Sequence, residues 1–580
     1  MKGITILLLF VFATKLYAQQ TQNEKRESYP TDYFRNPLNI PIFLAGNFGE
    51  CRPGHFHSGV DIKTLGEENQ PVHAAAEGYI SRIKMEKGGF GHGIYITHPS
   101  GYTTLYAHLN NFAPEIQKYV KEAQYAQKKW DVDLQFSAND FPVEKGQQIA
   151  WSGNTGSSTA PHLHFEIRDS KTEHPLNPEL FGLPIADKTQ PVLYEVVLYS
   201  GKVYEDSTLT ITLAKKGNQY KPIKTSTPGF TINNDTIEAW NTLTGVGINE
   251  DDFMEGSDNT LAPYLLKLYM DDSIQSQVTL DDIGYDETRY INGYADYKTH
   301  EVYKKWIQCL FQLPGNRLNG IYSNLNSNKG RLNLADGKIH KIKIEVIDDK
   351  NNASTISFFV KPAKSYTGAK ANADAIKFQS TESNYFTDPN LEFALDAKQL
   401  YDDIFFRFNK TSDNSVYSDR FMLHYSYVPL HHYFDLRIKP NKPIPFDLRN
   451  KVVLRYSDGK SKDDDGKAAT FTDKGWYVAK VRNFGTYWLD IDTIPPTIKP
   501  LQKTTNFSAL KQITFEAKDD MTSVKSFAGH IDGKWVCFEQ HGNLFFYKFD
   551  EHCPKGKHNL VLRAEDENGN SQTYRITFTR

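Results

Sequence analysis

The sequence has little cysteine and no surplus of charge of either sign. Four cysteines occur in 580 residues, too few for a disulfide framework. Lysine and arginine number 67 against 70 aspartate and glutamate residues, a formal net charge of -3. Proteins that grip nucleic acid through its phosphates usually carry a basic surplus on some face, so this balance argues against a nucleic-acid partner.

Long apolar runs are also scarce. The stretch from Ile4 to Ala13 follows Lys2 and precedes a plausible cleavage site at Leu16-Tyr17-Ala18. It is too short to span a bilayer, which takes about 20 residues, although a signal anchor is the alternative interpretation. We therefore predict a signal peptide at residues 1–18, no transmembrane segment in the mature chain, and an exported product that is periplasmic or extracellular.

The composition favours strands over helices. Aromatic residues reach 13%, with 36 phenylalanines and 33 tyrosines, which suits pleated, half-buried surfaces. A chain of 580 residues corresponds to about three to five domains at roughly 150 residues each. We predict a mostly β protein whose N-terminal domain, residues 30–184, has short strands separated by glycine turns.

After Pro184 an internal repeat emerges. Two segments that begin at Asp187 and Asp492 introduce similar stretches, and each stretch closes with a hairpin in which His, Asp and Asn keep the same spacing. The hairpins alternate apolar and polar residues, so one face points inward. We predict an immunoglobulin-like sandwich at 187–362 with a large insertion, a β-rich domain at 363–491, and a compact immunoglobulin-like sandwich at 492–580.

Two local features add detail to this outline. Apolar residues recur at steps of three and four over about 113–130, which predicts a helix inserted between strands, either as a structural support or as a wall of a groove. Cys537 and Cys553 flank a hairpin-like segment and could form a disulfide, an alternative the sequence leaves open.

Histidine is concentrated in residues 30–184, which hold nine of the 18 in the chain. His57 and Asp61 lie four residues apart and can face one metal ion if the chain is extended. His162, His164 and Glu166 alternate with apolar residues and so share one face of a strand. The spacing alone does not decide which of the two histidines is a ligand, and Glu166 is expected as a strand-end surface carboxylate or as an acceptor that orients a neighbouring ligand.

Taken in order, these motifs resemble one known family. His57-x-x-x-Asp61, then Tyr106-Ala-His108-Leu109, then Ser152-Gly153 through His162-Leu-His164 resembles the lysostaphin and LytM-type zinc endopeptidases, over about residues 40–182. The resemblance implies a β-rich catalytic domain with one Zn²⁺ held by His57, Asp61 and His164. It leaves His108 and His162 as the catalytic pair.

The chemistry of such a site fits peptide hydrolysis. Two imidazoles and one carboxylate leave the ion partly unneutralised, so a fourth position can acidify water. The HExxH motif is absent from the sequence, so the helix-borne glutamate base is missing and the histidine pair takes the proton-transfer roles. We therefore expect a zinc metalloendopeptidase that cuts peptide cross-links of peptidoglycan.

The partners expected are peptidoglycan stem peptides, with the C-terminal β domains as contacts to the cell wall or to another protein. The alternative is a non-catalytic protein that uses the same fold to bind peptidoglycan or to regulate another hydrolase.

Overall fold

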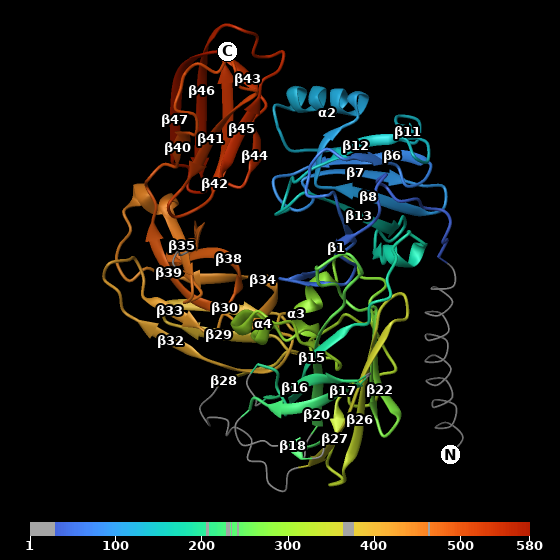
Figure 1. Cartoon of the computed structure of the whole chain (residues 1–580). Helices are drawn as coiled ribbons and strands as arrows, with labels where there is room; N and C mark the ends of the chain where they lie inside the picture. The colour runs from blue at the N-terminus through green and yellow to red at the C-terminus, as the bar shows by residue number, and fades with distance from the viewer. Residues whose placement is uncertain are drawn as a thin grey trace, which may run out of the picture.

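The computed structural model describes residues 29–204, 208–217, 219–227, 232–233, 235–240, 243–362, 376–461 and 465–580. The predicted signal peptide lies outside the described residues. Strands dominate the described chain, so the prediction of a mostly β protein is confirmed (Figure 1). None of the helices in these ranges is both long and apolar enough to cross a membrane.

The N-terminal part, residues 29–184, is built on a large antiparallel sheet and a smaller one. The large sheet follows the order β1-β4-β13-β8-β7-β6-β10, with β11 (Pro142–Val143) and β14 (Pro175–Leu176) at its side. The bounds of its main strands are β1 Leu44–Gly46, β4 Val60–Lys63, β13 His162–Asp169, β8 Tyr102–Ala107, β7 His92–Thr97, β6 Gly78–Met85 and β10 Val132–Gln135. The smaller sheet joins β5 (Pro71–His73), β12 (Gln148–Ser152) and β9 (Leu109–Phe112).

Strand β13 is central in the large sheet and is buried on both faces. Leu163, Phe165 and Ile167 are fully buried in the apolar core, as the alternation of the sequence predicts. The opposite face, which carries His164 and Glu166, is also buried. A strand covered on both sides must satisfy every polar side chain within the protein, so the partners of these two residues decide what they do.

Helix α2, Pro114–Gln127, follows strand β9 within the segment where the sequence predicts a helix. Pro114 stands at its first turn, where the missing N–H costs no hydrogen bond, and Lys128 ends it in the left-handed conformation. Ile116, Val120 and Gln124 face the N-terminal sheets and are buried.

Residues 187–362 form a single sheet of thirteen strands within the described residues, rather than two separate facing sheets. Its central strands, in sheet order, are β20 Leu243–Asp251, β15 Val192–Tyr199, β16 Thr208–Lys216, β17 Gln219–Thr225, β27 Ala353–Pro362, β26 His340–Ile347, β21 Leu265–Met270 and β22 Ser273–Thr279. Strands β17 and β19 (Thr236–Ala239) pair in parallel with β27, whereas the other neighbouring long strands named here pair antiparallel. Short helices, α3 (Ile291–Tyr294) and α4 (Tyr297–Tyr303), lie in the connection after β22.

Residues 376–491 form two five-stranded sheets, and they share one continuous apolar core with residues 187–362. The first sheet contains β29 Asn384–Asp388, β30 Leu391–Leu395, β34 Pro429–Ile438, β38 Tyr477–Asn483 and β37 Thr470–Phe471. The second contains β32 Phe408–Thr411, β33 Arg420–Leu423, β39 Gly485–Ile491, β35 Val452–Ser457 and β36 Asp465–Ala468.

The C-terminal part is a compact pair of four-stranded sheets around its own core. One sheet contains β40 Thr497–Pro500, β41 Gln512–Lys518, β45 Leu544–Lys548 and β44 Glu539–His541. The other contains β43 Lys534–Val536, β42 Val524–Ile531, β46 Lys557–Asp566 and β47 Ser571–Thr579. The proposed disulfide is absent. All four cysteines are free, because Cys553 is buried in this core while Cys537 lines a pocket on the surface of the sandwich.

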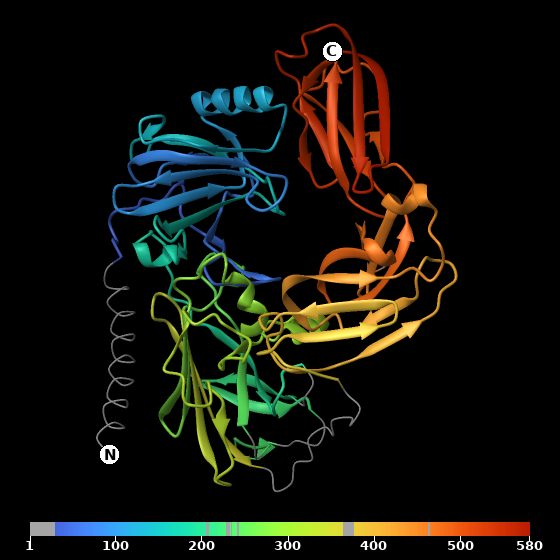
Figure 2. The ribbon, with the colours of Figure 1, turned by 180° about the vertical axis from the view of Figure 1, so that it is seen from behind.

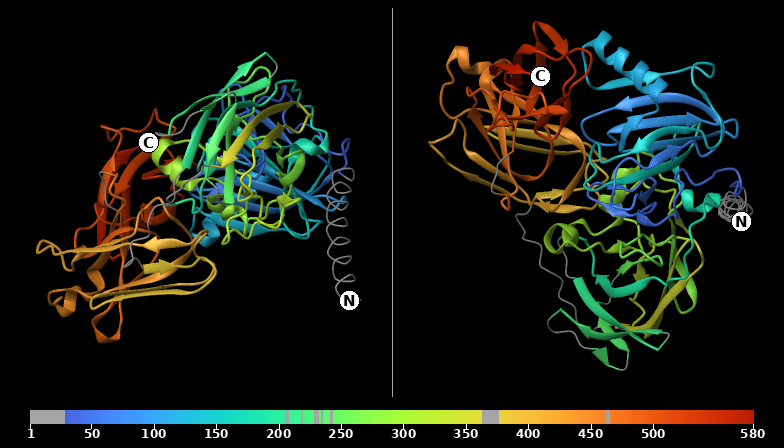
Figure 3. Two further views of the ribbon diagram at one scale, coloured as in Figure 1. Left: turned by 90° about the horizontal axis from the view of Figure 1, so that it is seen from below. Right: turned by 45° about the horizontal axis from the view of Figure 1, so that its top comes forward.

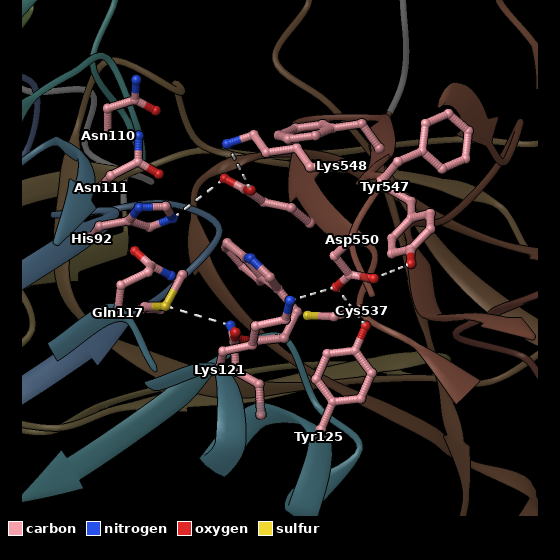
Figure 4. A pocket seen from close by; sticks show the side chains of 16 residues that line it. His92, Asn110, Asn111, Gln117, Lys121, Tyr125, Cys537, Tyr547, Lys548 and Asp550 are labelled. Carbon is pink, nitrogen blue, oxygen red and sulfur yellow. Dashed lines mark hydrogen bonds and ion pairs between the residues drawn. The ribbon is translucent and has the colours of Figure 1, made fainter. Parts of the chain in front are cut away.

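The four parts follow one another around an arc, and the C-terminal sandwich returns to lie beside helix α2 (Figures 2 and 3). A pocket separates the two, and Figure 4 shows Lys121 and Tyr125 of the helix pointing across it toward Asp550. Lys121 Nζ lies 2.9 Å from Asp550 Oδ2, and the Tyr125 hydroxyl donates to the same oxygen at 3.0 Å. The helix therefore packs on the N-terminal sheets and also contacts a domain more than 350 residues away, which its sequence pattern did not predict.

Candidate metal centre

Sheet register brings the first three candidate residues together. In the antiparallel pair β13·β4, His164 stands directly opposite Asp61. His57 lies just before β4, held by two backbone hydrogen bonds of 2.9 Å to Gly49 and Glu50. The result is a tight group: His57 Nε2 is 3.1 Å from Asp61 Oδ1 and 3.0 Å from His164 Nδ1, and His164 Nδ1 is 2.9 Å from Asp61 Oδ1.

Gly59 explains how the short loop between His57 and Asp61 fits. A Cβ at this position would meet the backbone oxygen of Phe165 in β13 at 2.3 Å, closer than real contacts allow. A side chain here would push β4 away from β13. The glycine in the His57-x-x-x-Asp61 motif is therefore required for the two ligand-bearing segments to approach each other.

Each imidazole of the group has its other nitrogen occupied. His57 Nδ1 donates to the backbone oxygen of Asn47 at 2.7 Å, and His164 Nε2 donates to Glu166 Oε1 at 2.9 Å. These bonds fix the tautomers and leave His57 Nε2 and His164 Nδ1 as lone-pair donors turned toward Asp61. Two ring nitrogens and a carboxylate oxygen therefore converge in a buried place, and together they could hold a divalent cation.

Glu166 is buried, with none of its surface exposed, so its interpretation as a strand-end surface carboxylate is wrong. Because β13 is central and covered, its carboxylate needs donors. Arg168 Nε lies 2.6 Å from Oε2, and the Ser58 hydroxyl donates to Oε1 at 2.6 Å. Burial raises the pKa of Glu166, but Arg168 and His164 outweigh burial and lower it to about 2, so Glu166 is an anion that orients His164.

Tyr285 completes this network from a different part of the chain. It lies between β22 and α3, and its hydroxyl donates to Glu166 at 2.6 Å while accepting from Arg168 at 2.8 Å. The sequence analysis missed this residue. No local signal marks it, since it is 119 residues from Glu166 and is joined to it only through the packing of residues 187–362 against the N-terminal part.

Arg52 is a second residue that the sequence analysis missed. It ends the short strand β2 (Cys51–Arg52), and its Nη2 lies 2.6 Å from Asp61 Oδ2, the oxygen that does not face the histidines. Burial raises the pKa of Asp61, but His57 and the hydrogen bonds from His162 and His164 hold it well below its usual range. Asp61 is therefore ionised, with one oxygen held by Arg52 and the other turned to the imidazoles.

The pKa values of His57 and His164 are shifted in opposite directions. Burial, aided by Arg52, lowers the pKa of His57 to about 4, so His57 is neutral and able to ligate. Burial also lowers the pKa of His164, but its bonds to Asp61 and Glu166 outweigh burial and raise it to about 9. Without a metal ion, His164 is therefore charged and donates from Nδ1 to Asp61 and from Nε2 to Glu166. A metal ion ligated at Nδ1 would take the place of that proton.

His108 and His162 lie beside this group without joining it. Their ring centroids are 4.7 Å apart, and His108 is 5.8 Å from the ring of His164. His108 follows β8 with a positive φ of 57°, and its Nδ1 donates to the backbone oxygen of Thr155 at 2.8 Å. Burial and the neighbouring histidines 164 and 162 lower the pKa of His108 to about 3.

His162 is the more exposed of the pair. Its Nδ1 lies 2.8 Å from the oxygen of Ala160, and its Nε2 is 3.4 Å from Asp61 Oδ1. The structure thus brings all five predicted residues together but separates them into a buried trio and an adjacent pair. His55, two residues before His57, is exposed on strand β3 (His55–Phe56), which pairs with β2, and its ring bonds to the backbone oxygen of Pro53.

A buried His–Asp–His group lies where the neighbouring strands β4 and β13 pair, and two further histidines lie beside it. This set of residue types is typical of a metallopeptidase site. Residues 55–126 and 134–178 match peptidase family M23, and the interruption falls just after helix α2. The N-terminal part of the chain is therefore a peptidase family M23 domain of the LytM type, as the sequence resemblance predicted. Residues 375–492 match a Zu5-like domain.

The similarity to curated relatives covers only part of the chain. The DD-carboxypeptidase/endopeptidase Mpg of Neisseria meningitidis is 35% identical over 134 residues, which is 23% of this chain and 24% of the relative. Lysostaphin of Staphylococcus simulans is 29% identical over 187 residues, 32% of this chain and 30% of the relative. The chain thus spans about a quarter to a third of the length of these curated relatives.

Among solved structures, the catalytic domain of the M23 protein EnpA from Enterococcus faecalis is similar at 20% identity with a TM-score of 0.20, covering 26% of this chain and 98% of that one.

Proposed function

We propose that the protein is a zinc metalloendopeptidase that hydrolyses peptide cross-links of bacterial peptidoglycan. The observation that carries this proposal is the convergence of His57 Nε2, Asp61 Oδ1 and His164 Nδ1 within 3.1 Å of one another at a buried position. A relative named peptidoglycan DD-endopeptidase ShyB, from Vibrio cholerae, which is 30% identical over 130 residues, supports the substrate class.

In this proposal His57, Asp61 and His164 hold the ion. Zn²⁺ bound there would act as a Lewis acid that polarises the scissile carbonyl and lowers the pKa of water from about 15.7 toward about 7. Asn47 and Glu166 keep the two imidazoles in the ligating tautomer, and Arg52 keeps Asp61 ionised. The chain therefore presents a prepared ligand set instead of building one when the metal arrives.

His108 and His162 are assigned the proton transfers. Thr155 fixes the ring of His108 through Nδ1, which leaves Nε2 to exchange a proton with the substrate. His162 is held through Nδ1 at Ala160, so its Nε2 is likewise turned to the site. One imidazole takes the proton of the attacking water and one stabilises the developing oxyanion or protonates the leaving amine.

Export to the periplasm or the cell exterior is part of the same proposal, because the substrate class lies there and residues 1–18 have the pattern of a signal peptide. The assignment of residues 30–184 as the catalytic domain, and of the C-terminal β domains as contacts to the wall or to a partner, also belongs to it.

The test uses the full chain with His164→Ala, which removes one ligand. We expect the loss of bound zinc, measured by elemental mass spectrometry, together with the loss of peptide release from purified sacculi. His55→Ala is the matched control, since it removes an exposed histidine of the same loop, and it should keep both. Unchanged zinc in His164→Ala would refute the ligand set. Full zinc in the wild type without any cleavage would instead favour a binding or regulatory protein.

A further inference from the structure

Two further groups of carboxylates lie outside the M23 domain, one in each of the two domains that share the internal repeat. The first cluster contains Asp187, Asp252 and Asp348, and the second contains Asp492, Asp519 and Asp520; in each, one oxygen of every residue lies within 4.8 Å of the others. Most of these residues are buried. The exposed fraction is 3% for Asp252 and 1% for Asp492. Acidic groups on a surface gather without consequence, but buried ones repel each other at close range.

Both clusters stand on the same backbone framework. Asp348 ends strand β26 and receives hydrogen bonds from the backbone N–H and side-chain amide of Asn352, at 2.7 and 2.6 Å. Asn352 also donates to the backbone oxygen of Asp187 at 3.4 Å.

The C-terminal domain repeats each of these bonds, with Asp566, which is not itself a member of the second cluster, in the place of Asp348. Asp566 ends strand β46 and receives 2.8 and 2.7 Å bonds from Asn570, which donates to the backbone oxygen of Asp492 at 3.2 Å. The aspartate and asparagine thus anchor the segment that enters each domain. Two domains that differ in size and sheet structure have kept the same arrangement around the acidic group.

Several carboxylate oxygens in the clusters lack any donor. Asp252 Oδ1, Asp492 Oδ2 and Asp519 Oδ2 are buried and have no hydrogen-bond partner among the described residues. Leaving a buried acceptor unpaired costs about 1–3 kcal/mol, and more for a charged group. One such oxygen in one cluster would be an isolated defect. Both clusters have buried oxygens without a donor, on Asp252 in the first and on Asp492 and Asp519 in the second, which indicates that something else satisfies them.

The electrostatics point the same way. Burial and the carboxylate of Asp348 raise the pKa of Asp252 to about 9. Burial and Asp519 raise the pKa of Asp492 to about 6. Burial is the larger cause in each case and the adjacent carboxylate adds to it. Converging buried oxygens without donors are the arrangement that a multivalent cation relieves.

We propose that each cluster binds one hard divalent cation of the calcium type. All side-chain donors are carboxylate oxygens, and neither histidine nor cysteine contributes, which disfavours zinc and other transition metals. Ca²⁺ accepts six to eight oxygen ligands in irregular geometry, so three carboxylates with backbone carbonyls and water suit it better than they suit Mg²⁺, which demands an octahedron.

The positions of the clusters define what the cations do. Asp187 lies between the M23 domain and strand β15, and Asp492 lies between the Zu5-like domain and strand β40. Each cation would join the segment that enters a domain, at Asp187 or Asp492, to a loop of that domain, at Asp252 or Asp519. The Asp–Asn pair links the same entering segment to the closing hairpin of that domain. The ions would therefore stiffen both junctions.

The experiment counts bound calcium in the full chain. Protein treated with EGTA and then resupplied with zinc is dialysed against Ca²⁺, and both metals are measured by elemental mass spectrometry. The wild type should bind two Ca²⁺ per chain. Asp252→Asn and Asp519→Asn should each bind one, and the double variant should bind none. Asp258→Asn, an exposed aspartate of the loop after Asp252, is the matched control and should keep two.

Zinc content separates this test from the proposed peptidase function, because it should stay the same in all five proteins whether or not they cleave sacculi. Fewer than one Ca²⁺ bound to the wild type overturns the proposal, as does a count that neither substitution lowers. Loss at one cluster alone overturns it for the other cluster.

A thermal unfolding series covers the case in which a variant fails to fold. Ca²⁺ should raise the unfolding midpoint of the wild type, by mass action on the folded state, more than Mg²⁺ does at the same concentration. No difference between Ca²⁺ and buffer would contradict the proposal independently of any variant.

Discussion

The metal group of the M23 domain and the two aspartate clusters solve the burial of acidic side chains in different ways. Asp61 is compensated within the protein: Arg52 binds one oxygen and two imidazoles face the other. Asp252 and Asp492 are surrounded by other carboxylates and retain unpaired oxygens. The first arrangement is preorganised before any metal arrives, whereas the second is complete only with a cation.

The ligand types make the same distinction. Imidazoles held by Asn47 and Glu166 turn their other nitrogens toward Asp61, beside the histidine pair that is proposed to transfer protons. The clusters present only oxygen, at junctions with no histidine pair beside them in the described structure. Acidic residues are present in both kinds of site. A candidate catalytic site differs from a candidate structural one in the type of ligand atom and in the residues that hydrogen-bond to the ligands.

The largest expected effect comes from Asp61→Asn, which keeps the shape but removes the ligand charge. We expect zinc to be lost and cleavage of sacculi to fall at least about 1,000-fold, since a catalytic metal supplies several kcal/mol. Bound calcium should not change. If Asp61→Asn removed calcium and spared zinc, the contrast between the two kinds of site would be reversed.

Substitution of His108 or His162 by alanine should separate metal binding from catalysis. General acid–base groups contribute about 100- to 10,000-fold, so kcat should fall by that amount while zinc stays bound. The measurement is cleavage of isolated muropeptides together with zinc content. Loss of zinc in either variant would place that histidine among the ligands.

Glu166→Gln tests the preorganisation of His164. Removing the carboxylate charge that receives His164 Nε2–H should weaken zinc binding by about 10- to 100-fold, as measured by competition with a chelator. Glu173→Gln, which changes an exposed glutamate of the same domain, is the control and should bind zinc as the wild type does. Equal affinity in the two variants would show that Glu166 only balances Arg168.

Tyr285→Phe should have the smallest effect. The substitution removes one hydroxyl of the domain that contains the first aspartate cluster. It therefore tests whether the contact of that domain with Glu166 contributes to zinc binding. A hydrogen bond to a charged group contributes about 1.5–3 kcal/mol, and with Ser58 and Arg168 still bound to Glu166 we expect a loss near or below that range in unfolding free energy. Zinc affinity should fall only a few-fold, and a loss as large as that of Glu166→Gln would contradict this ranking.

Much of the M23 domain could be predicted from the sequence. The motifs of His57, His108 and His164 are strictly local patterns in known order, and the alternation in β13 correctly placed Leu163, Phe165 and Ile167 in the core. The same alternation gave no information on how deep the other face lies, because that depends on what packs over the sheet. Glu166 was therefore expected at the surface and is buried.

The repeat after Pro184 shows a similar limit. Matching His, Asp and Asn spacings marked the two closing hairpins, and the structure shows both aspartates clamped by the following asparagines. The spacing did not show that Asp187 and Asp252 converge on the first hairpin. It also did not show that the described strands of 187–362 form one sheet, or that this domain shares an apolar core with the next one. The spacing of Cys537 and Cys553 left a disulfide open, and in the structure both are free, with Cys553 in the core and Cys537 at a pocket.

The sequence by itself determined the class of strand-rich chain, the order of the metal-binding motifs and the existence of an internal repeat, because short-range spacing and composition encode all three. Only the tertiary structure decided which buried polar groups have a hydrogen-bond or ion-pair partner, and which residue provides it. The bond of Tyr285 to Glu166 and the unpaired oxygen of Asp252 depend on distant segments, whose sheets close over one another and exclude water. Arg52 lies only nine residues from Asp61, yet no sequence motif marks their contact.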